Sequence, residues 1–214
     1  MIRHVTLVRH AESEINTWHP PIIGGRSRWC ELTPRGIAQA RHLGQWLAET
    51  RPPIDRVAAS TAVRAQQTAR YSLEPHTALR RIETFTTLEE MDQGDWENLP
   101  RAQTYTPAVI AQMQALVWDF SAPGGESQGQ VFARGLRWLE EEVLPRDDAH
   151  TWVFTHGLFI KLLVTGLRGG DRATAWQVPI QNTSITRLAH DARGWRVIDQ
   201  NTFPQGTIDD AVYL

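Results

Sequence analysis

The chain has 214 residues, a formal net charge of −2 and 41% apolar residues, which is enough to build the core of one α/β domain. This charge gives no basic field for nucleic acid, and no apolar stretch approaches the ~20 residues of a membrane span. The only cysteine, Cys30, excludes an internal disulfide. We expect one domain over residues 1–214, soluble and cytoplasmic, that binds neither nucleic acid nor membrane. The oligomeric state stays open.

The first half of the chain alternates between short apolar runs and amphipathic segments. Residues 4–9 and 54–60 predict two strands. A helix is predicted between them, because Thr33 can cap it, Pro34 fits its first turn and apolar residues recur at helical spacing. A second helix follows the second strand, and residues 79–88 predict a third extended stretch.

The second half repeats this alternation after one irregular region. Residues 97–125 contain several prolines and a short apolar pattern, which predicts a small helical insertion. A turn at 123–127 leads into a helix that runs to about Leu144. Residues 150–156 predict a strand, an apolar helix follows, and two closing strands are joined by a turn at 191–194. The pattern predicts an α/β three-layer sandwich, with a mainly parallel central sheet and helices on both faces.

Two strands of this pattern end in a histidine. Arg9 and His10 follow the first apolar run, and His156 follows a later one. In open α/β sheets, ligands bind beyond the carboxyl ends of the strands. Because parallel strands bring these ends to one edge, we expect the three side chains to converge. Asn16 lies in the loop after His10, and Arg64 lies in the first turn of the helix after residues 54–60.

These residue types together predict a site for a phosphate dianion. Guanidinium groups bind phosphate oxygens with a matching fork of donors, and helix starts, such as the one after His156, favour anions. No HExxH, GxxxxGK[ST], GxGxxG or GxSxG pattern is present, so zinc, nucleotide-loop and serine-elbow chemistry are not predicted. From the residues alone, ordinary structural roles as ion-pair partners or hydrogen-bonded histidines stay open.

Six segments in chain order resemble motifs of the histidine phosphatase superfamily, also called phosphoglycerate mutase-like. The segments are LVRHAES with Asn16, LTPRGIAQA (32–40), ASTAVRAQQTA (59–69), LEEMDQGDWEN (88–98), PGGES (123–127) and VFTHG (153–157). The resemblance covers nearly the whole chain and implies the phosphoglycerate mutase-like fold.

The resemblance also implies roles for the matching residues. His10 would be the nucleophile that forms a phosphohistidine, and a neutral imidazole with a pKa near ~6.5 suits that role. Glu90 would be the general acid, chosen over Glu89 because the family's glutamate lies four residues before its glycine, here Gly94. Arg9 and His156 would also be catalytic. The phosphate-binding residues would be Arg9, Asn16, Arg64, His156 and Gly157. The arginines would supply positive charge, so we expect no metal and no cofactor.

One departure from the family pattern bears on the substrate. The loop before LTP reads GGRSRWCE, where the family often has an aspartate and a proline. We expect Arg26, Arg28 and Trp29 in this loop to border the pocket and to influence the choice of substrate. Glu126 in PGGES is expected to close the rim of the site or to cap its helix.

The leading hypothesis is a metal-independent phosphatase, a phosphomonoesterase acting on a small phosphorylated metabolite. It rests on the short segment between Glu90 and His156, because mutases of the family typically carry a longer one. The first alternative is a cofactor-dependent phosphoglycerate mutase, which needs priming by a bisphosphoglycerate. The second is a non-catalytic regulatory protein that binds a phosphate ligand. The sequence does not identify the metabolite.

Overall fold

The computed structural model describes residues 2–75, 81–170 and 172–203. Within them, six strands form one sheet in the order β3-β2-β4-β1-β5-β6. The strands are β1 (Arg3–Arg9), β2 (Arg56–Ser60), β3 (Glu83–Phe85), β4 (His150–Thr155), β5 (Ile185–Asp191) and β6 (Gly194–Thr202). The first four are parallel, whereas β5 and β6 are antiparallel to their neighbours. The mainly parallel sheet is confirmed.

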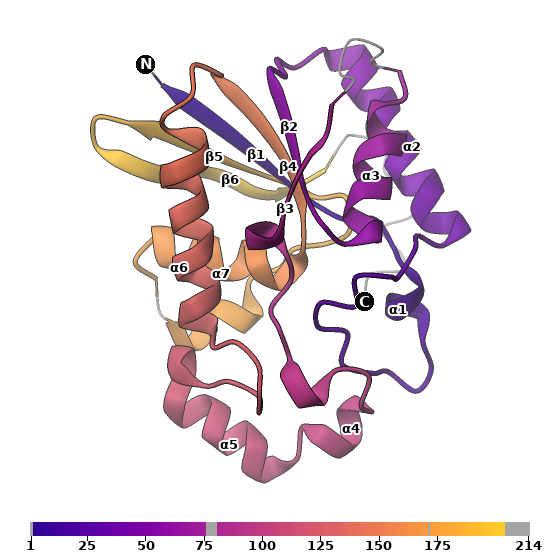
Figure 1. The fold of residues 1–214 in the computed structure, drawn as a ribbon, viewed down its shortest axis with the longest axis vertical. Helices are drawn as coiled ribbons and strands as arrows, with labels where there is room; N and C mark the ends of the chain where they lie inside the picture. Colours follow the sequence, from indigo (N-terminus) through magenta and orange to yellow (C-terminus); the bar gives the residue numbers. More distant parts are fainter. Residues whose placement is uncertain (1, 76–80, 171, 204–214) are drawn as a thin grey trace.

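Helices cover both faces of this sheet, as the three-layer prediction requires. Figure 1 shows α2 (Pro34–Thr50) and α3 (Val63–Leu73) on one side, and α6 (Gln128–Trp138) and α7 (Gly157–Leu167) on the other. Alternate residues of β1 point to opposite layers: Leu7 packs in the cluster with Phe159 of α7, and Val8 packs in the cluster with Leu43 of α2. The two cores therefore fix β1, and with it the strand end that carries Arg9.

The predicted insertion at 97–125 contains helices that lie beyond the sheet, at the lower end of Figure 1. These are α4 (Arg101–Thr104), α5 (Pro107–Leu116) and the 3-10 helix η3 (Val117–Asp119). Thr106 caps α5 and Pro107 occupies its first position. The other short elements are α1 (Glu14–Thr17), the 3-10 helices η1 (Thr86–Leu88), η2 (Gly94–Trp96) and η5 (Arg172–Gln177), and the π-helix η4 (Leu139–Val143).

Two predicted elements differ in extent. The third extended stretch, 79–88, contains a strand only at 83–85, because η1 follows at once, and residues 79–80 lie outside the described residues. The α-helix predicted to reach Leu144 ends at Trp138 and continues as η4. Within the described residues, every helix is too short or too polar to cross a membrane.

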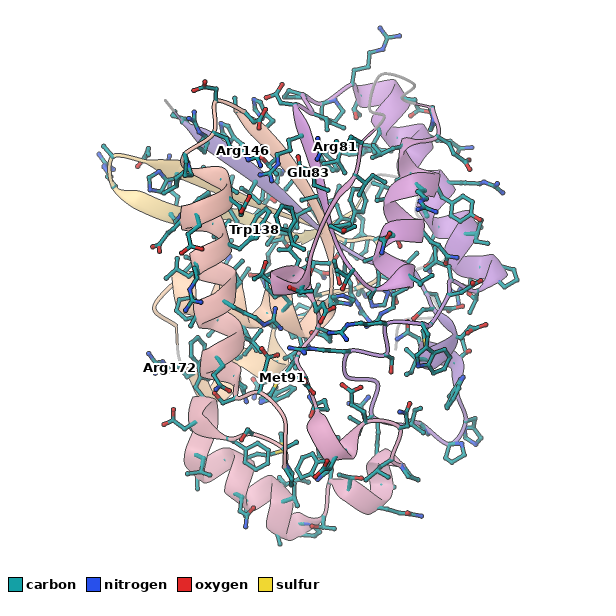
Figure 2. All side chains as sticks on the ribbon, in the orientation of Figure 1. Arg81, Glu83, Met91, Trp138, Arg146 and Arg172 are labelled. Atoms are coloured by element: carbon teal, nitrogen blue, oxygen red, sulfur yellow. The ribbon has the colours of Figure 1, made fainter. Side chains whose placement is uncertain are left out.

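Charged and aromatic side chains hold the short edge strand β3. Arg56 donates from Nε and Nη2 to the two carboxylate oxygens of Glu83, both at 3.1 Å. Figure 2 shows Glu83 beside Arg146, which lies 3.4 Å away, and above Trp138, whose ring meets Phe85 edge-on. The hydrogen bonds from Arg56 lower the pKa of Glu83. This packing fixes the strand that leads, through η1, to Glu89 and Glu90.

Candidate active site

The carboxyl ends of β1 and β4 meet at one edge of the sheet, because the two strands are parallel in register. A cavity of about 320 Å³ lies there. Six of the predicted site residues line it: Arg9, His10, Asn16, Arg64, Glu90 and Gly157. His156 is fully buried and does not line the cavity, but its ring lies 5.3 Å from that of His10. The predicted residues thus come together, although they are distant in the sequence.

His10 presents one ring nitrogen to the cavity. Its Nδ1 lies 2.7 Å from the carbonyl oxygen of Ala11, and since a carbonyl can only accept, Nδ1 carries the proton. Nε2 therefore holds the lone pair, and Nε of Arg64 donates to it at 3.3 Å. Burial, then the charges of Arg64 and Arg9, hold the pKa of His10 well below its ordinary value. At neutral pH the ring is neutral, which is the state that the expected nucleophile role requires.

Arg64 joins the two histidines. It is 2% exposed, and Nη2 donates to Nδ1 of His156 at 3.1 Å while Nη1 donates to the carbonyl of Ser27 at 2.7 Å. Because Nδ1 of His156 accepts, its Nε2 donates to Oγ of Ser60, 2.8 Å away. Burial, followed by the charges of Arg64 and His10, keeps the pKa of His156 well below its usual range. The arrangement fixes two neutral imidazoles around one guanidinium.

Arg9 and Asn16 supply further donors. Arg9 donates from Nη1 to the carbonyl of Ile180 at 2.7 Å, and it packs so close to Gly157 that a Cβ there would lie 3.1 Å from Nε of Arg9. The amide oxygen of Asn16 accepts from the backbone N–H and the hydroxyl of Ser13, each at 3.0 Å. The amide NH₂ of Asn16 is then the group that can donate to a ligand.

The amino-terminus of α7 holds Glu90. Backbone N–H groups of Leu158 and Phe159 donate to the two carboxylate oxygens at 3.1 and 2.9 Å, which is the favourable place for a carboxylate on a helix. The sequence led us to expect that this helix start would bind the ligand anion. These two N–H groups instead fix the carboxylate of Glu90 beside the cavity. Gly157, the residue of the helix start that we expect to bind the anion, lines the cavity, and its contact with the ligand stays a prediction.

Glu89 has a different environment, which fits the choice of Glu90 as the pocket residue. Glu89 is 1% exposed and accepts from Nε and Nη2 of Arg28 at 2.6 and 2.8 Å; Thr61 donates to it as well. Burial alone would raise the pKa of Glu89, but the hydrogen bonds from Arg28 and Thr61 and the charges of Arg28 and Arg26 outweigh it and lower the pKa. Glu89 is therefore a buried ion-pair partner.

The arginines of the 17–32 loop are placed differently from the expectation. Arg26, Arg28 and Trp29 are absent from the described residues that line the cavity, where Ile23, Gly24 and Gly25 border it instead. Arg26 pairs with Glu89, Asp92 and Glu126 at 3.0 to 3.3 Å. Trp29 is exposed and packs against Trp18. Acidic side chains, whose positions the sequence does not reveal, neutralise these loop arginines.

Glu126 is linked to Glu90 indirectly, through Arg134. Its carboxylate accepts from Nε of Arg134 at 2.8 Å, and Nη2 of Arg134 donates to the backbone carbonyl of Glu90 at 3.1 Å. Ser127, rather than Glu126, caps α6. Glu126 thus acts through Arg134 on the segment that carries Glu90.

Several residues that line the cavity were missed by the sequence analysis: Gln93, Arg101, Tyr105, Lys161 and Trp176. Lys161 could have been identified from the sequence, because it is the only lysine of the chain and lies on the helix after His156. Burial lowers its pKa first, and the charge of Arg9 lowers it further. Arg101 and Tyr105 lie in the insertion, where no pattern indicates which side chains face inward.

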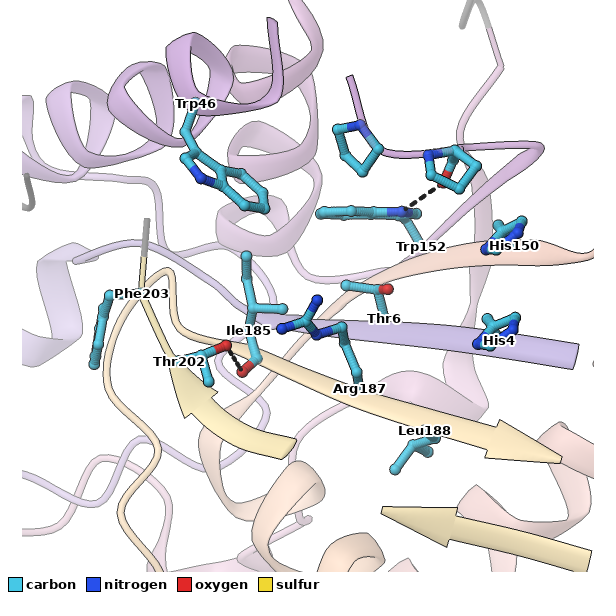
Figure 3. Close-up of a pocket in the computed structure, with 12 residues that line it drawn as sticks. His4, Thr6, Trp46, His150, Trp152, Ile185, Arg187, Leu188, Thr202 and Phe203 are labelled. Carbon is cyan, nitrogen blue, oxygen red and sulfur yellow. Dashed lines mark hydrogen bonds between the residues drawn. The ribbon is translucent and has the colours of Figure 1, made fainter. Parts of the chain in front are cut away.

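A separate cavity of about 280 Å³ lies between α2 and the sheet (Figure 3). Trp46 and Trp152 line it, and it reaches His4 and His150 at the amino ends of β1 and β4, away from His10. Arg187 at this cavity is already paired with Asp199 at 2.7 Å. The residues predicted to bind the anion, among them Arg9, Asn16 and Arg64, line the first cavity and are absent from the lining of this one. Among the described residues, no three His, Cys, Asp or Glu side chains are grouped to hold a metal ion.

Known proteins resemble this chain in sequence and in fold. The sequence profile of the histidine phosphatase superfamily (branch 1) matches residues 5–202. A 2,3-bisphosphoglycerate-dependent phosphoglycerate mutase of Azorhizobium caulinodans is 34% identical over 178 residues, covering 77% of this chain and 81% of that protein.

Solved structures share the fold over almost their full length. The protein named Mycobacterial hydrolase 1 superposes with a TM-score of 0.76 at 25% identity, covering 94% of this chain and 99% of that one. The alpha-ribazole phosphatase of Shigella flexneri superposes with a TM-score of 0.77 at 22% identity, covering 96% and 100%. With the profile match over nearly the whole chain, these likenesses confirm the resemblance read from the six motifs: the chain belongs to the histidine phosphatase superfamily, branch 1.

Proposed function

We propose that the protein is a phosphatase that hydrolyses a small phosphorylated metabolite through a phosphohistidine at His10. One observation carries the proposal: Nε2 of His10 holds its lone pair in a cavity that Glu90 also lines. Nucleophile and proton donor thus share one site, and Arg9 and Arg64 provide the positive charge that a transferring phosphoryl group needs.

In the first step, the N–H of Arg64 releases Nε2 of His10. The freed lone pair of Nε2 attacks phosphorus, and the bond from phosphorus to the ester oxygen breaks. Glu90 in its protonated form gives its proton to the departing oxygen, and the product alcohol leaves. Arg64 lies against Nε2, so its guanidinium is placed to bind the phosphoryl oxygens during transfer. The backbone N–H groups of Leu158 and Phe159 keep Glu90 in position for this transfer.

In the second step, water attacks the phosphohistidine. The carboxylate of Glu90 takes a proton from the water as the bond between phosphorus and Nε2 breaks, which releases inorganic phosphate and restores neutral His10. The hydrogen bond from Nδ1 to Ala11 holds the ring in the same orientation through both steps. No proton or bond is left unaccounted for, since Glu90 ends the cycle protonated, as it began.

The mutase remains the second candidate, because the relative from Azorhizobium caulinodans bears that name. The alignment covers similar shares of both chains, 77% and 81%, so that relative is of similar length. The short segment between Glu90 and His156 therefore does not distinguish a phosphatase from a mutase. Hydrolysis is favoured by the structural neighbour named a hydrolase, which is 25% identical over almost the whole of both chains.

The test measures phosphate release from a panel of phosphorylated metabolites in EDTA, with isomerisation of 3-phosphoglycerate followed in parallel, with and without 2,3-bisphosphoglycerate. We expect phosphate release from some of these compounds, and no release from His10→Ala. Isomerisation without net phosphate release would favour the mutase. A control variant, His42→Ala, removes a histidine of α2 that lies outside the cavity and should keep wild-type turnover.

A further inference from the structure

The phosphate cavity continues into a second, more apolar cleft. This cleft has a volume of about 470 Å³ and lies between the helices of the insertion and η5. Arg101, Tyr105 and Trp176 line both spaces. A ligand whose phosphate lies at His10 therefore reaches the cleft by passing these three side chains. We call this space the insertion cleft.

The wall of the insertion cleft is one apolar face of α5 and η3. Ile110, Met113 and Val117 line it. Ile110 and Met113 are three residues apart and therefore lie on the same side of α5, and Val117 follows the end of that helix. Trp176 of η5 also lines the cleft. The polar lining residues are Gln114, Gln128, Arg172 and Gln177. Of these, Arg172 stacks on the ring of Trp118, 4.7 Å away, and is labelled beside the insertion in Figure 2.

This apolar face is only partly covered by the protein itself. Helix α5, fully described here, has the sequence PAVIAQMQAL and yet no buried residue. Ile110 is 43% exposed and Trp176 is 37% exposed. Apolar side chains gathered on one exposed patch are typical of a surface that binds a partner or ligand. The continuity with the phosphate cavity indicates that the ligand is the substrate.

The two spaces differ in chemistry, and Arg101 and Tyr105 mark the boundary. The inner space holds the charged groups Arg9, Arg64 and Glu90 beside His10. The outer space has a more apolar lining, in which Ile110, Met113 and Trp176 stand beside glutamine side chains and Arg172. At the boundary, the guanidinium of Arg101 lies 5.7 Å from the centre of the Tyr105 ring. Trp96 packs edge-on against the same ring and holds it in place. A compound the size of phosphoglycerate would occupy the inner space and leave the outer one unfilled.

We propose that the substrate is a phosphomonoester whose alcohol carries an extended apolar group, alkyl or aromatic, and that this group lies in the insertion cleft against Ile110 and Met113. This inference rests on the proposed function and adds the substrate class. Ile110 and Met113 act as specificity-determining residues, with no part in the chemistry at His10. Binding removes apolar surface from water on both sides, which is the source of the affinity.

The experiment uses two matched series of compounds, alkylphosphonates and alkyl phosphates. In each series the alkyl chain increases from ethyl to octyl. Calorimetry gives the affinity of alkylphosphonates, which cannot be hydrolysed, and phosphate release gives kcat/KM for the alkyl phosphates. Each methylene that enters the cleft should improve affinity and kcat/KM by roughly two- to fourfold, the upper figure being full burial. Affinity that does not change with chain length would overturn the inference.

Three substitutions on α5 locate the effect. Ile110→Gln and Met113→Gln should remove most of the gain from ethyl to octyl and leave the ethyl compounds unchanged. Leu116→Gln is the matched control, because Leu116 is an apolar residue of the same helix, 53% exposed, that does not line the cleft. An equal loss in all three variants would contradict the proposed location. A second copy of the chain covering this face would also contradict it. Sedimentation would show this as a dimer that Ile110→Gln separates into single chains.

The two proposals fail in different ways. If no alkyl phosphate is hydrolysed but phosphonate affinity still rises with chain length, hydrolysis is wrong and the insertion cleft stands. If ethyl phosphate and longer esters are hydrolysed with equal kcat/KM and phosphonate affinity is flat, the phosphatase stands and the inference about the cleft is wrong.

Discussion

Nε of Arg64 lies 3.3 Å from Nε2 of His10, the only ring nitrogen of His10 with a lone pair available. The same guanidinium reaches His156 and the carbonyl of Ser27 through its other two nitrogens. Arg64 is therefore held on three sides, and under the proposed function its position sets where a phosphoryl group on Nε2 would be bound. A planar fork with five donors can make these contacts together, whereas a single ammonium cannot.

From this geometry we expect Arg64→Lys to be nearly as inactive as Arg64→Ala. Loss of one preorganised donor typically costs about 10²- to 10³-fold in kcat, and the lysine variant should recover little of it. The measurement is kcat and KM for p-nitrophenyl phosphate. Arg41→Lys is the control, because Arg41 is an exposed residue of α2 that pairs with Glu74, lies over the ring of Tyr71 and does not line the cavity. A lysine variant within about threefold of wild type would contradict the requirement for the fork.

Glu90 and its neighbour Glu89 should give opposite results when each is changed to glutamine. Glu90→Gln keeps the size of the side chain and removes the proton donor, so esters with poor leaving groups should slow far more than p-nitrophenyl phosphate, whose leaving group needs little protonation. The ratio of kcat/KM for the two ester types, compared between variant and wild type, reports this. Equal losses on both types would argue against a proton-donor role.

Glu89→Gln should instead lower stability with no preference for the leaving group. Glu89 is buried and accepts two charge-assisted hydrogen bonds from Arg28. Hydrogen bonds to charged groups are worth about 1.5–3 kcal/mol each. Arg28 is largely exposed, so in the variant its guanidinium can form hydrogen bonds with water instead. We therefore expect the free energy of unfolding to fall by about 1–3 kcal/mol. Urea unfolding of both variants measures the difference.

The sequence predicted the parts of the site that depend on strand ends and failed where contacts depend on loops. Arg9 ends β1, and His10 and His156 directly follow β1 and β4. The rule for parallel sheets brings them together without knowledge of the loops. The partner of Glu90 could not be predicted in this way. It depends on how the segment after η1 lies against the start of α7, which no spacing in the sequence encodes.

The prediction for the loop arginines was wrong for the same reason, because their contacts also depend on how loops pack. Arg26 and Arg28 lie in the loop that the sequence analysis expected to border the pocket. A cation beside a phosphate site suggests a contact with the ligand. In the structure, Glu89, Asp92 and Glu126 surround them. Charge pairs between distant segments are decided by packing, because any of several arginines could satisfy the same carboxylate. The insertion is similar: its helices were predicted, but the cavity-lining side chains Arg101 and Tyr105 were not.

The pKa values of His10 and His156 predict a loss of stability at mildly acidic pH. Burial, with the charge of Arg64, places both folded-state pKa values well below the ~6.5 of an unfolded chain. Between the folded and unfolded values, the unfolded chain binds more protons. The free energy of unfolding therefore falls as the pH drops below ~6.5, by up to about 1.4 kcal/mol per pH unit for each histidine.

Urea unfolding at pH 7.5, 6.5 and 5.5 checks this prediction, and His10→Gln should show a shallower decline than wild type. This pH range lies above the region in which the lowered pKa values of Glu83, Glu89 and Glu126 matter, since those carboxylates lose their stabilising contribution only as the pH falls below their ordinary value of ~4.3. Identical slopes for His10→Gln and wild type would mean that His10 is not buried as a neutral ring.

Gly157 should be needed for the position of Arg9. A Cβ at this residue would lie 3.1 Å from Nε of Arg9 and 3.4 Å from its Cδ, so Gly157→Ala must push the guanidinium away by a few tenths of an ångström. If Arg9 binds the transferring phosphoryl group as we propose, a small displacement of its guanidinium is costly, and we expect about a tenfold loss of kcat/KM for p-nitrophenyl phosphate. Stability should hardly change, because alanine favours the first turn of α7 more than glycine does.

Gly170→Ala separates this local effect from a general effect of replacing glycine. The nearest atoms to a Cβ at Gly170 lie at 3.6 and 3.8 Å, which is ordinary contact, and Gly170 does not line the cavity. That variant should keep wild-type kcat/KM. If Gly157→Ala also keeps it, Arg9 can shift without cost, and its place in the phosphate pocket would have to be assigned to another donor. If Gly157→Ala loses activity while its unfolding midpoint in urea is unchanged, the close packing of Gly157 against Arg9 is what orients this arginine toward the phosphoryl group.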